Sequence, residues 1–174
     1  MKGKIIAMVI VGVALLVGAG VYYAQVYAYY QPVPADDPRA EMRLAPLGGG
    51  TPERIPVEDF RGIDADSSPL RFRACFMLPI SLATLTETFV IAEGVEPLIA
   101  PGWFDCFDAA EIGKALEGGE AVAFIGEKNI EYGIDRIVAV FRDGRAFAWN
   151  RINSCGEVVF EGKPAPAGCP PAPN

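Results

Sequence analysis

The pattern of hydrophobic and polar residues divides the chain into one long apolar segment near its start and a mixed remainder. Residues 5–24 are twenty consecutive uncharged positions that follow Lys2 and Lys4. As a helix, such a run is about 30 Å long, which is the thickness of the hydrocarbon core of a bilayer. The pattern predicts a transmembrane anchor helix over 5–30, with residues 1–4 before it.

A cleaved signal peptide is the alternative interpretation of this segment, because a basic start and an apolar middle are common to both. The run is longer than the usual signal-peptide core of about 7–15 residues. Tyrosines crowd its far end, where aromatic side chains mark a membrane interface. These residues are Tyr22, Tyr23, Tyr27, Tyr29 and Tyr30. We therefore expect an uncleaved anchor that ends in a tyrosine belt.

The central part of the chain mixes strand and helix patterns. Alternation over 70–78 predicts a strand, and the apolar runs 121–125, 136–141 and 146–150 predict three more. An Asp-Gly pair at 143–144 predicts a tight hairpin turn between the last two runs. Such strands form a small antiparallel sheet.

Two helices are expected beside these strands. Ser81 can cap a short helix that runs to Phe89, and Asp108 with Glu111 fits the start of another. Gly118 supplies the stop of the second helix. The predicted fold is α+β, with a transmembrane helix before a disulfide-stapled domain that carries a three- or four-stranded antiparallel sheet and one or two helices.

Irregular segments flank this domain. Residues 31–56 are rich in proline and glycine and have no usable period, so they are predicted to be a linker. The domain is expected over 57–161. Residues 162–174 are expected to be a Pro-rich tail that Cys169 pins to the domain.

Charge predicts the orientation of the anchor. Lys2 and Lys4 precede it, and the rest of the chain carries the other 13 Lys and Arg against 22 Asp and Glu, a net charge of −9. The positive-inside rule places 1–4 in the cytoplasm and the domain in the periplasm, with the anchor in a bacterial inner membrane. An acidic domain repels phosphate backbones, so nucleic acid is not an expected partner.

Four cysteines follow the anchor, which in an exported domain favours two disulfides. They are Cys75, Cys106, Cys155 and Cys169. Four cysteines allow three pairings. We favour Cys75–Cys106 with Cys155–Cys169, because the second bridge closes a loop of about 15 residues and fixes the tail.

The chain has no histidine. It therefore cannot form a Ser-His-Asp triad, a Cys-His pair or a zinc site with imidazole ligands. The cysteines are too far apart in sequence for a Cys₄ zinc site, so no metal, cofactor or catalytic residue is expected.

The stretch 103–108, WFDCFD, sets Cys106 between Asp105 and Asp108 on aromatic neighbours. A catalytic thiol is disfavoured, because adjacent carboxylates raise its pKa and no imidazole can serve as a base. Asp108 is expected to cap the helix that follows.

Arg71 and Arg73 alternate with apolar residues, and we expect one of them to pair with Asp105, with contact to an acidic partner as the alternative. A set of side chains is predicted to contact a ligand or partner. These residues are Trp103, Phe104, Phe107, Trp149, Arg71 and Arg73.

Four runs resemble an uncharacterised family of single-pass membrane proteins from alphaproteobacteria of the Rhodobacter type. They are 68–76, 100–109, 133–136 and 143–145. The resemblance spans the chain from anchor to hairpin and implies no established activity, cofactor or catalytic residue.

Three functions are compatible with these features. The favoured one is a non-enzymatic accessory protein whose helix contacts other inner-membrane proteins. A periplasmic ligand-binding or envelope-sensing module is the alternative, with a pocket lined by the aromatic residues named above. An enzyme that acts through carboxylates alone is the least favoured.

Overall fold

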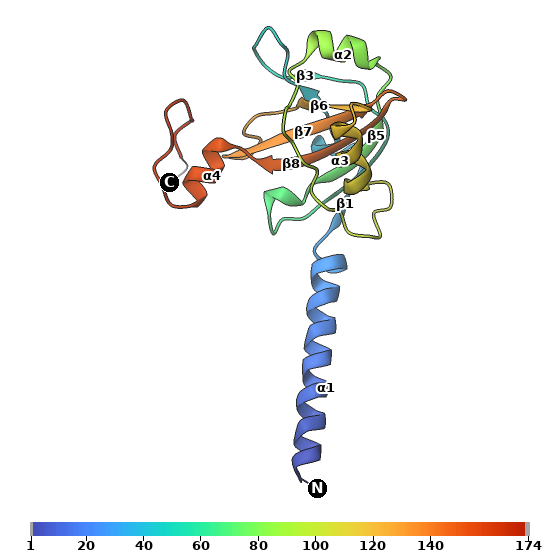
Figure 1. Cartoon of the computed structure of the whole chain (residues 1–174), viewed down its shortest axis with the longest axis vertical. Coiled ribbons are helices and arrows are strands. Elements are labelled where there is room, and N and C mark those ends of the chain that lie inside the picture. The colour runs from blue at the N-terminus through green and yellow to red at the C-terminus, as the bar shows by residue number, and fades with distance from the viewer. Residues whose placement is uncertain (1, 173–174) are drawn as a thin grey trace.

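The computed structural model describes residues 2–172 and shows a long helix with a compact domain at its far end (Figure 1). Helix α1 spans Lys2–Tyr23 and continues as a π-helical turn, η1, over Ala24–Ala28. Among the described residues, Gly3–Ala28 is the one helix long and apolar enough to cross a membrane, and none of its most apolar part is buried. Such a helix near the N-terminus fits a membrane anchor or a signal sequence.

The domain is built on a six-stranded sheet in which every pairing is antiparallel. The order across the sheet is β1 (Gln31–Val33), β4 (Glu58–Asp64), β5 (Arg73–Met77), β8 (Arg145–Ile152), β7 (Ile134–Phe141) and β6 (Ala121–Ile125). The predicted α+β class and antiparallel sheet are confirmed. The sheet is larger than expected because β1 and β4 extend it beyond β5.

The linker predicted over 31–56 is wrong, because this segment is an integral part of the domain. Its β1 pairs with β4, while β2 (Arg43–Leu44) and β3 (Glu53–Arg54) form a two-stranded hairpin. A 3-10 turn, η2, spans Pro38–Ala40. Val33, Met42, Leu44 and Ile55 are all buried. These apolar residues are scattered among prolines and polar residues, so no sustained period in the sequence reveals that they enter the core.

The helices of the domain are short. They are η3 (Pro69–Arg71), α2 (Leu82–Thr88), α3 (Ala109–Glu117) and α4 (Ser154–Phe160). Both predicted caps are confirmed, since Ser81 Oγ accepts a hydrogen bond from the backbone N–H of Thr84, and Asp108 Oδ1 accepts from those of Ala110 and Glu111. Because η3 occupies the start of the predicted strand 70–78, β5 begins only at Arg73.

The core lies on both faces of the sheet. Along β8, Ala146 and Ala148 face one cluster with Phe72 and Leu85, whereas Phe147 and Trp149 face the other with Ile112. Helix α2 and the β2–β3 hairpin cover the first face, and α3 covers the second. Because both faces are covered, all eight residues of β7 are buried. This is why six of its eight residues are apolar, the exceptions being the buried Asp135 and Arg136.

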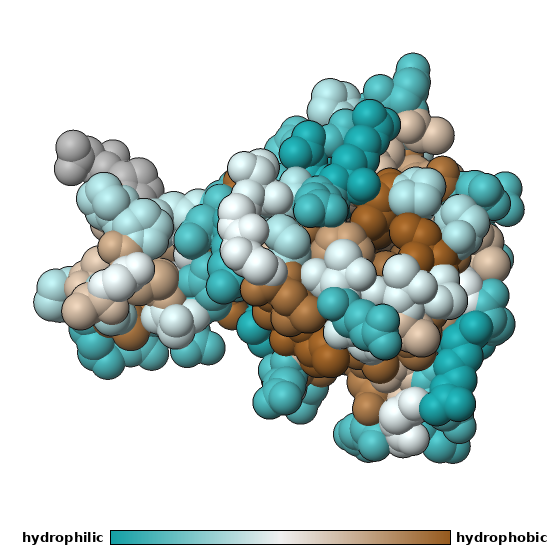
Figure 2. Space-filling model, turned by 90° about the horizontal axis from the view of Figure 1, so that it is seen from above, coloured by the Kyte–Doolittle hydropathy of each residue, from teal (hydrophilic) through white to brown (hydrophobic). Residues whose placement is uncertain are grey.

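The sequence did not predict α4, which contains two β-branched valines and a glycine that disfavour helix. Asn153 caps it by accepting from the N–H groups of Cys155 and Gly156. The helix lies against the loop before β7 through two glycines, since a Cβ added to Gly133 would lie 2.5 Å from Gly156 Cα. Beyond α4, the tail projects from the side of the domain as an arm (Figure 2).

Candidate functional site at the exit of the helix

Trp103 contacts the end of the N-terminal helix. Its indole Nε1 donates a hydrogen bond of 2.7 Å to the backbone carbonyl of Val26 in η1. Its ring is stacked near that of Tyr27, with centroids 6.4 Å apart, and meets Tyr30 edge-on at 6.1 Å. Two tyrosines of the predicted belt therefore pack against the domain and hold the helix exit to it.

Arg71 reaches the same segment from η3. Its guanidinium lies 5.3 Å from the centre of the Tyr30 ring and donates a long hydrogen bond of 3.5 Å to the carbonyl of Gln25. The loop of Trp103 and the turn of Arg71 thus both contact the helix exit (Figure 1). The junction between helix and domain is a defined contact, held by side chains from two loops.

The expected pairing of Arg71 or Arg73 with Asp105 is wrong. Asp105 instead accepts a hydrogen bond of 2.6 Å from Arg61, and this bond lowers the pKa of its carboxyl group. Arg61 extends from β4, which was not predicted as a strand, so its position beside Asp105 could not be inferred from the sequence.

Arg73 is only 3% exposed and has no carboxylate partner within the described chain. All three of its guanidinium nitrogens donate to backbone carbonyls. The acceptors are Leu98, Ile99, Leu70 and Phe72, at 2.7–3.1 Å. Burial lowers the pKa of Arg73 to about 10, so it stays charged at neutral pH. The side chain ties the start of the Trp103 loop to β5 and η3.

Both predicted disulfides are formed. Cys75 on β5 bridges to Cys106, and Cys155 on α4 bridges to Cys169 in the tail, which leaves no free cysteine. Cys106 is therefore bonded and not a free thiol nucleophile. Two disulfides indicate an oxidising compartment.

The aromatic residues predicted to line one pocket are placed in different environments. Phe104, Phe107 and Trp149 are buried, with the rings of Phe107 and Trp149 packed edge-on at 6.4 Å. Trp103 is 39% exposed. Phe104 and Phe107 line one hollow of about 420 Å³, but neither Trp103 nor Trp149 lines it. The core packing decides this, because β8 turns Trp149 toward the face that α3 covers.

Ile99 was not among the residues predicted from the sequence, yet it is 83% exposed on the loop that leads to Trp103. The sequence does contain a signal that could have pointed to this loop, because residues 97–104 carry no charge. Leu98 beside it is 37% exposed.

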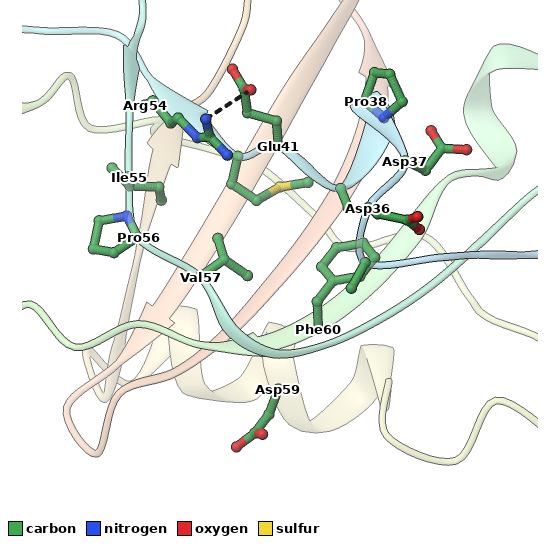
Figure 3. Close-up of a pocket in the computed structure, with 13 residues that line it drawn as sticks. Asp36, Asp37, Pro38, Glu41, Arg54, Ile55, Pro56, Val57, Asp59 and Phe60 are labelled. Carbon is green, nitrogen blue, oxygen red and sulfur yellow. Dashed lines mark ion pairs between the residues drawn. The ribbon is translucent and has the colours of Figure 1, made fainter.

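Two hollows lie elsewhere on the domain. An apolar groove of about 640 Å³ separates η3 from α4 and is lined by residues that include Leu70, Tyr132, Ile152 and Phe160. A more polar cleft of about 490 Å³ lies beside β3 and β4 (Figure 3). Phe60 and Val57 form part of its wall, while Asp59 points away from them on the other side of the strand.

Two carboxylates of the Figure 3 cleft, Asp37 and Glu41, are paired with arginines. Glu41 pairs with Arg43 and, at 3.4 Å, with Arg54. Asp37 accepts hydrogen bonds from Arg39, which lower the pKa of its carboxyl group to about 2. Across residues 2–172, no group of three or more His, Cys, Asp and Glu side chains could hold a metal ion. The cleft therefore offers two arginine-paired carboxylates, Asp37 and Glu41, beside Asp36 and Asp59.

The domain matches a described protein family. Residues 42–170, well over half of the chain, match the family of unknown function DUF6446. The match contains both disulfides and the Trp103 loop, whereas α1 precedes it. No curated protein and no solved structure matches the chain significantly. The match confirms an uncharacterised family, while its alphaproteobacterial source and its single-pass membrane nature stay predictions. On the strength of the match over 42–170, the chain belongs to the family of unknown function DUF6446.

Proposed function

We propose that this protein is a single-pass, non-enzymatic accessory protein of an alphaproteobacterial inner membrane. Its N-terminus lies in the cytoplasm, and its disulfide-stapled domain lies in the periplasm. Helix α1 contacts other inner-membrane proteins, while the domain covers their periplasmic surface. The tyrosines at the end of α1 lie at the outer interface of the bilayer.

The observation that carries this proposal is the bond from Trp103 to Val26. An accessory protein acts by placing its domain at a fixed position beside a neighbour, and a freely swinging domain could not do so. Contacts from two loops, through Trp103 and Arg71, hold the domain on the end of α1.

The surface of α1 supports a role in contacting other helices. No part of the domain covers its most apolar window. A Cβ added at Gly12, Gly18 or Gly20 would meet nothing within 4 Å. Small residues let transmembrane helices approach closely. The whole helix surface is therefore free for lipid and for a neighbouring helix.

A topology experiment tests the compartment. A reporter active only outside the cytoplasm, fused after Asn174, is expected to be active, and a reporter active only in the cytoplasm is expected to be silent. The membrane fraction after a carbonate wash should retain the full chain. A soluble form that starts near Gly20 or Tyr22 would identify a cleaved signal sequence and remove the anchor.

Photo-crosslinking tests the accessory role. A photoreactive residue placed at Gly18 or Leu16 in intact membranes should give one discrete protein adduct. The same probe at Leu47 on the domain, at the end away from α1, is the control. Adducts with lipid alone from every helix position would contradict a role through α1.

The apolar groove between η3 and α4 favours a second candidate, a periplasmic module that binds an apolar ligand. Phe160 is 56% exposed at its edge. A fluorescent fatty acid should bind to the full chain. The Phe160→Ser variant should no longer bind it. Unchanged binding would remove this candidate.

A further inference from the structure

We propose that the loop of residues 97–104 is a second membrane contact, which lies in the interfacial layer of the bilayer beside the exit of α1. This inference rests on the proposed function, because it requires α1 to span a membrane. The ligand is the lipid surface itself.

The loop has the composition of a membrane-contacting segment. Its eight residues, PLIAPGWF, lie between Glu96 and Asp105 and carry no charge. Among the described residues, no large apolar side chain is more exposed than Ile99, and even Leu16 on α1 is less so at 76%. Contiguous exposed apolar residues mark an interaction surface or a membrane contact. Leu98, Ile99 and Trp103 are three exposed apolar residues of this one loop.

The depth of the loop follows from its bond to the helix. Val26 lies two residues, or about 3 Å of helix rise, beyond Ala24, where the apolar run ends before the polar Gln25. The interfacial layer on each side of a bilayer is about 5–7 Å thick. Trp103, which donates to the carbonyl of Val26, therefore lies within this layer when α1 spans the core. Tryptophan is enriched at this depth.

The loop is already held in its exposed conformation without lipid. Arg73 donates to the carbonyls of Leu98 and Ile99 at 2.9 and 3.1 Å. Phe104 N–H donates to Pro101 O, and the disulfide from Cys106 follows directly. A loop that is already ordered loses little conformational freedom when its apolar side chains enter the interface.

Lipid is favoured over a partner protein as the occupant because the loop continues the surface of α1. The contact of Trp103 with η1 fixes the loop relative to the helix, so insertion of α1 brings Ile99 to the bilayer surface whatever other protein is present.

The test measures depth residue by residue in the full, oxidised chain. An environment-sensitive fluorescent amino acid replaces Ile99, and separately Leu47 and Val11. Leu47 is the matched control, because it is 56% exposed on the connection between β2 and β3, at the end of the domain away from α1. Val11 reports on the helix. Each protein is reconstituted into phosphatidylcholine and phosphatidylglycerol vesicles whose acyl chains carry a nitroxide quencher.

We expect the probe at 99 to lose most of its emission, the probe at 47 to lose none, and the probe at 11 to be quenched throughout. Quenching at 11 without quenching at 99 would overturn this inference and leave the anchor standing. No quenching at 11 would overturn the anchor and, with it, this inference. A probe at 99 that is shielded from aqueous iodide in native membranes, but not in vesicles of lipid alone, would assign the loop to a protein partner and overturn the lipid contact.

Discussion

The indole of Trp103 and the carbonyl of Val26 are joined by a hydrogen bond across 77 residues of chain. Val26 lies in a π-helical turn at the end of α1. Such turns are frequent at functional sites in proteins. This bond, together with the stacked ring of Tyr27, makes the anchor and the domain one connected unit at their junction.

Replacing Trp103 by Phe should loosen this junction. The aromatic contact with Tyr27 is retained, but the donor to Val26 is lost, and one hydrogen bond contributes about 0.5–1.5 kcal/mol. Hydrogen exchange at 24–30 should therefore become about 2- to 10-fold faster. Trp149→Phe is the control, because Trp149 is buried in the core away from η1. Equal exchange in Trp103→Phe and the wild type would show that the bond does not hold the helix.

Arg73→Lys should destabilise the domain by roughly 2–4 kcal/mol, because lysine cannot reach four carbonyl acceptors with one ammonium group. Arg71→Lys, two positions away in η3 and only partly buried, should cost less than about 1 kcal/mol. Urea unfolding of the full chain in detergent micelles measures both. Similar losses for the two variants would contradict the role of Arg73 as a clamp.

The two disulfides should differ in their effect on stability. Cys75→Ser or Cys106→Ser should each lower it by about 2–5 kcal/mol, and the double variant should cost little more, since both remove one bond.

Cys155→Ser or Cys169→Ser should cost less than about 1 kcal/mol, although a bridge of this span constrains the unfolded chain. Residues 160–168 are exposed throughout, so breaking the bridge frees the tail in the folded state as well as in the unfolded state. Denaturant midpoints of the four variants test the difference. A large loss from Cys169→Ser would mean that the tail stabilises the core.

Two glycine substitutions should have opposite effects on the stability of the domain. Gly156→Ala should cost about 1–3 kcal/mol, because its Cβ would collide with the backbone of Gly133. Gly113→Ala lies in α3, where the new Cβ would meet Pro97 at 3.8 Å, an ordinary contact. It should stabilise the domain by about 0.5–1 kcal/mol. Thermal unfolding of both variants tests the close approach of α4 to Gly133. An unchanged stability of Gly156→Ala would refute this approach.

Stability should change little between pH 5 and 8, because the chain has no histidine to titrate there. Hydrogen bonds from Arg39 lower the pKa of Asp37 from 3.8 to about 2, and Arg61 lowers that of Asp105. Between these values the unfolded state binds more protons than the folded state, so stability is lost as the pH falls from about 4 to about 2.

Both carboxylates lie at the surface, so added salt should weaken this acid dependence. Urea midpoints from pH 8 to pH 2 measure this dependence. In Asp37→Asn and Asp105→Asn, stability should fall less steeply as the pH is lowered. If stability still fell as steeply with pH in both variants as in the wild type, other groups would be responsible for the loss of stability in acid.

The sequence by itself determined the features that depend on local chemistry. An uncharged run of sufficient length predicts a helix that can cross a membrane, and Ser81 and Asp108 mark helix starts because their side chains accept from nearby N–H groups. The strands from 121 onward and the Asp-Gly turn were also predicted, since each has its pattern within a few residues. The lack of histidine excludes whole classes of catalytic and metal site through composition alone.

Only the tertiary structure decided how distant segments meet. Met42 and Leu44 enter the core because one face of the sheet, formed by β5, β6, β7 and β8, provides an apolar surface for them, which no local period records. Arg61 rather than Arg73 pairs with Asp105 because β5 turns Arg73 inward, where carbonyls are its nearest acceptors. Ile99 is exposed, although its sequence is as apolar as that of the core, because Arg73 and the Cys75–Cys106 bridge fix its loop beside the helix exit. Burial is a property of the neighbours that the chain brings together, so hydrophobicity alone could not distinguish Ile99 from Ile112.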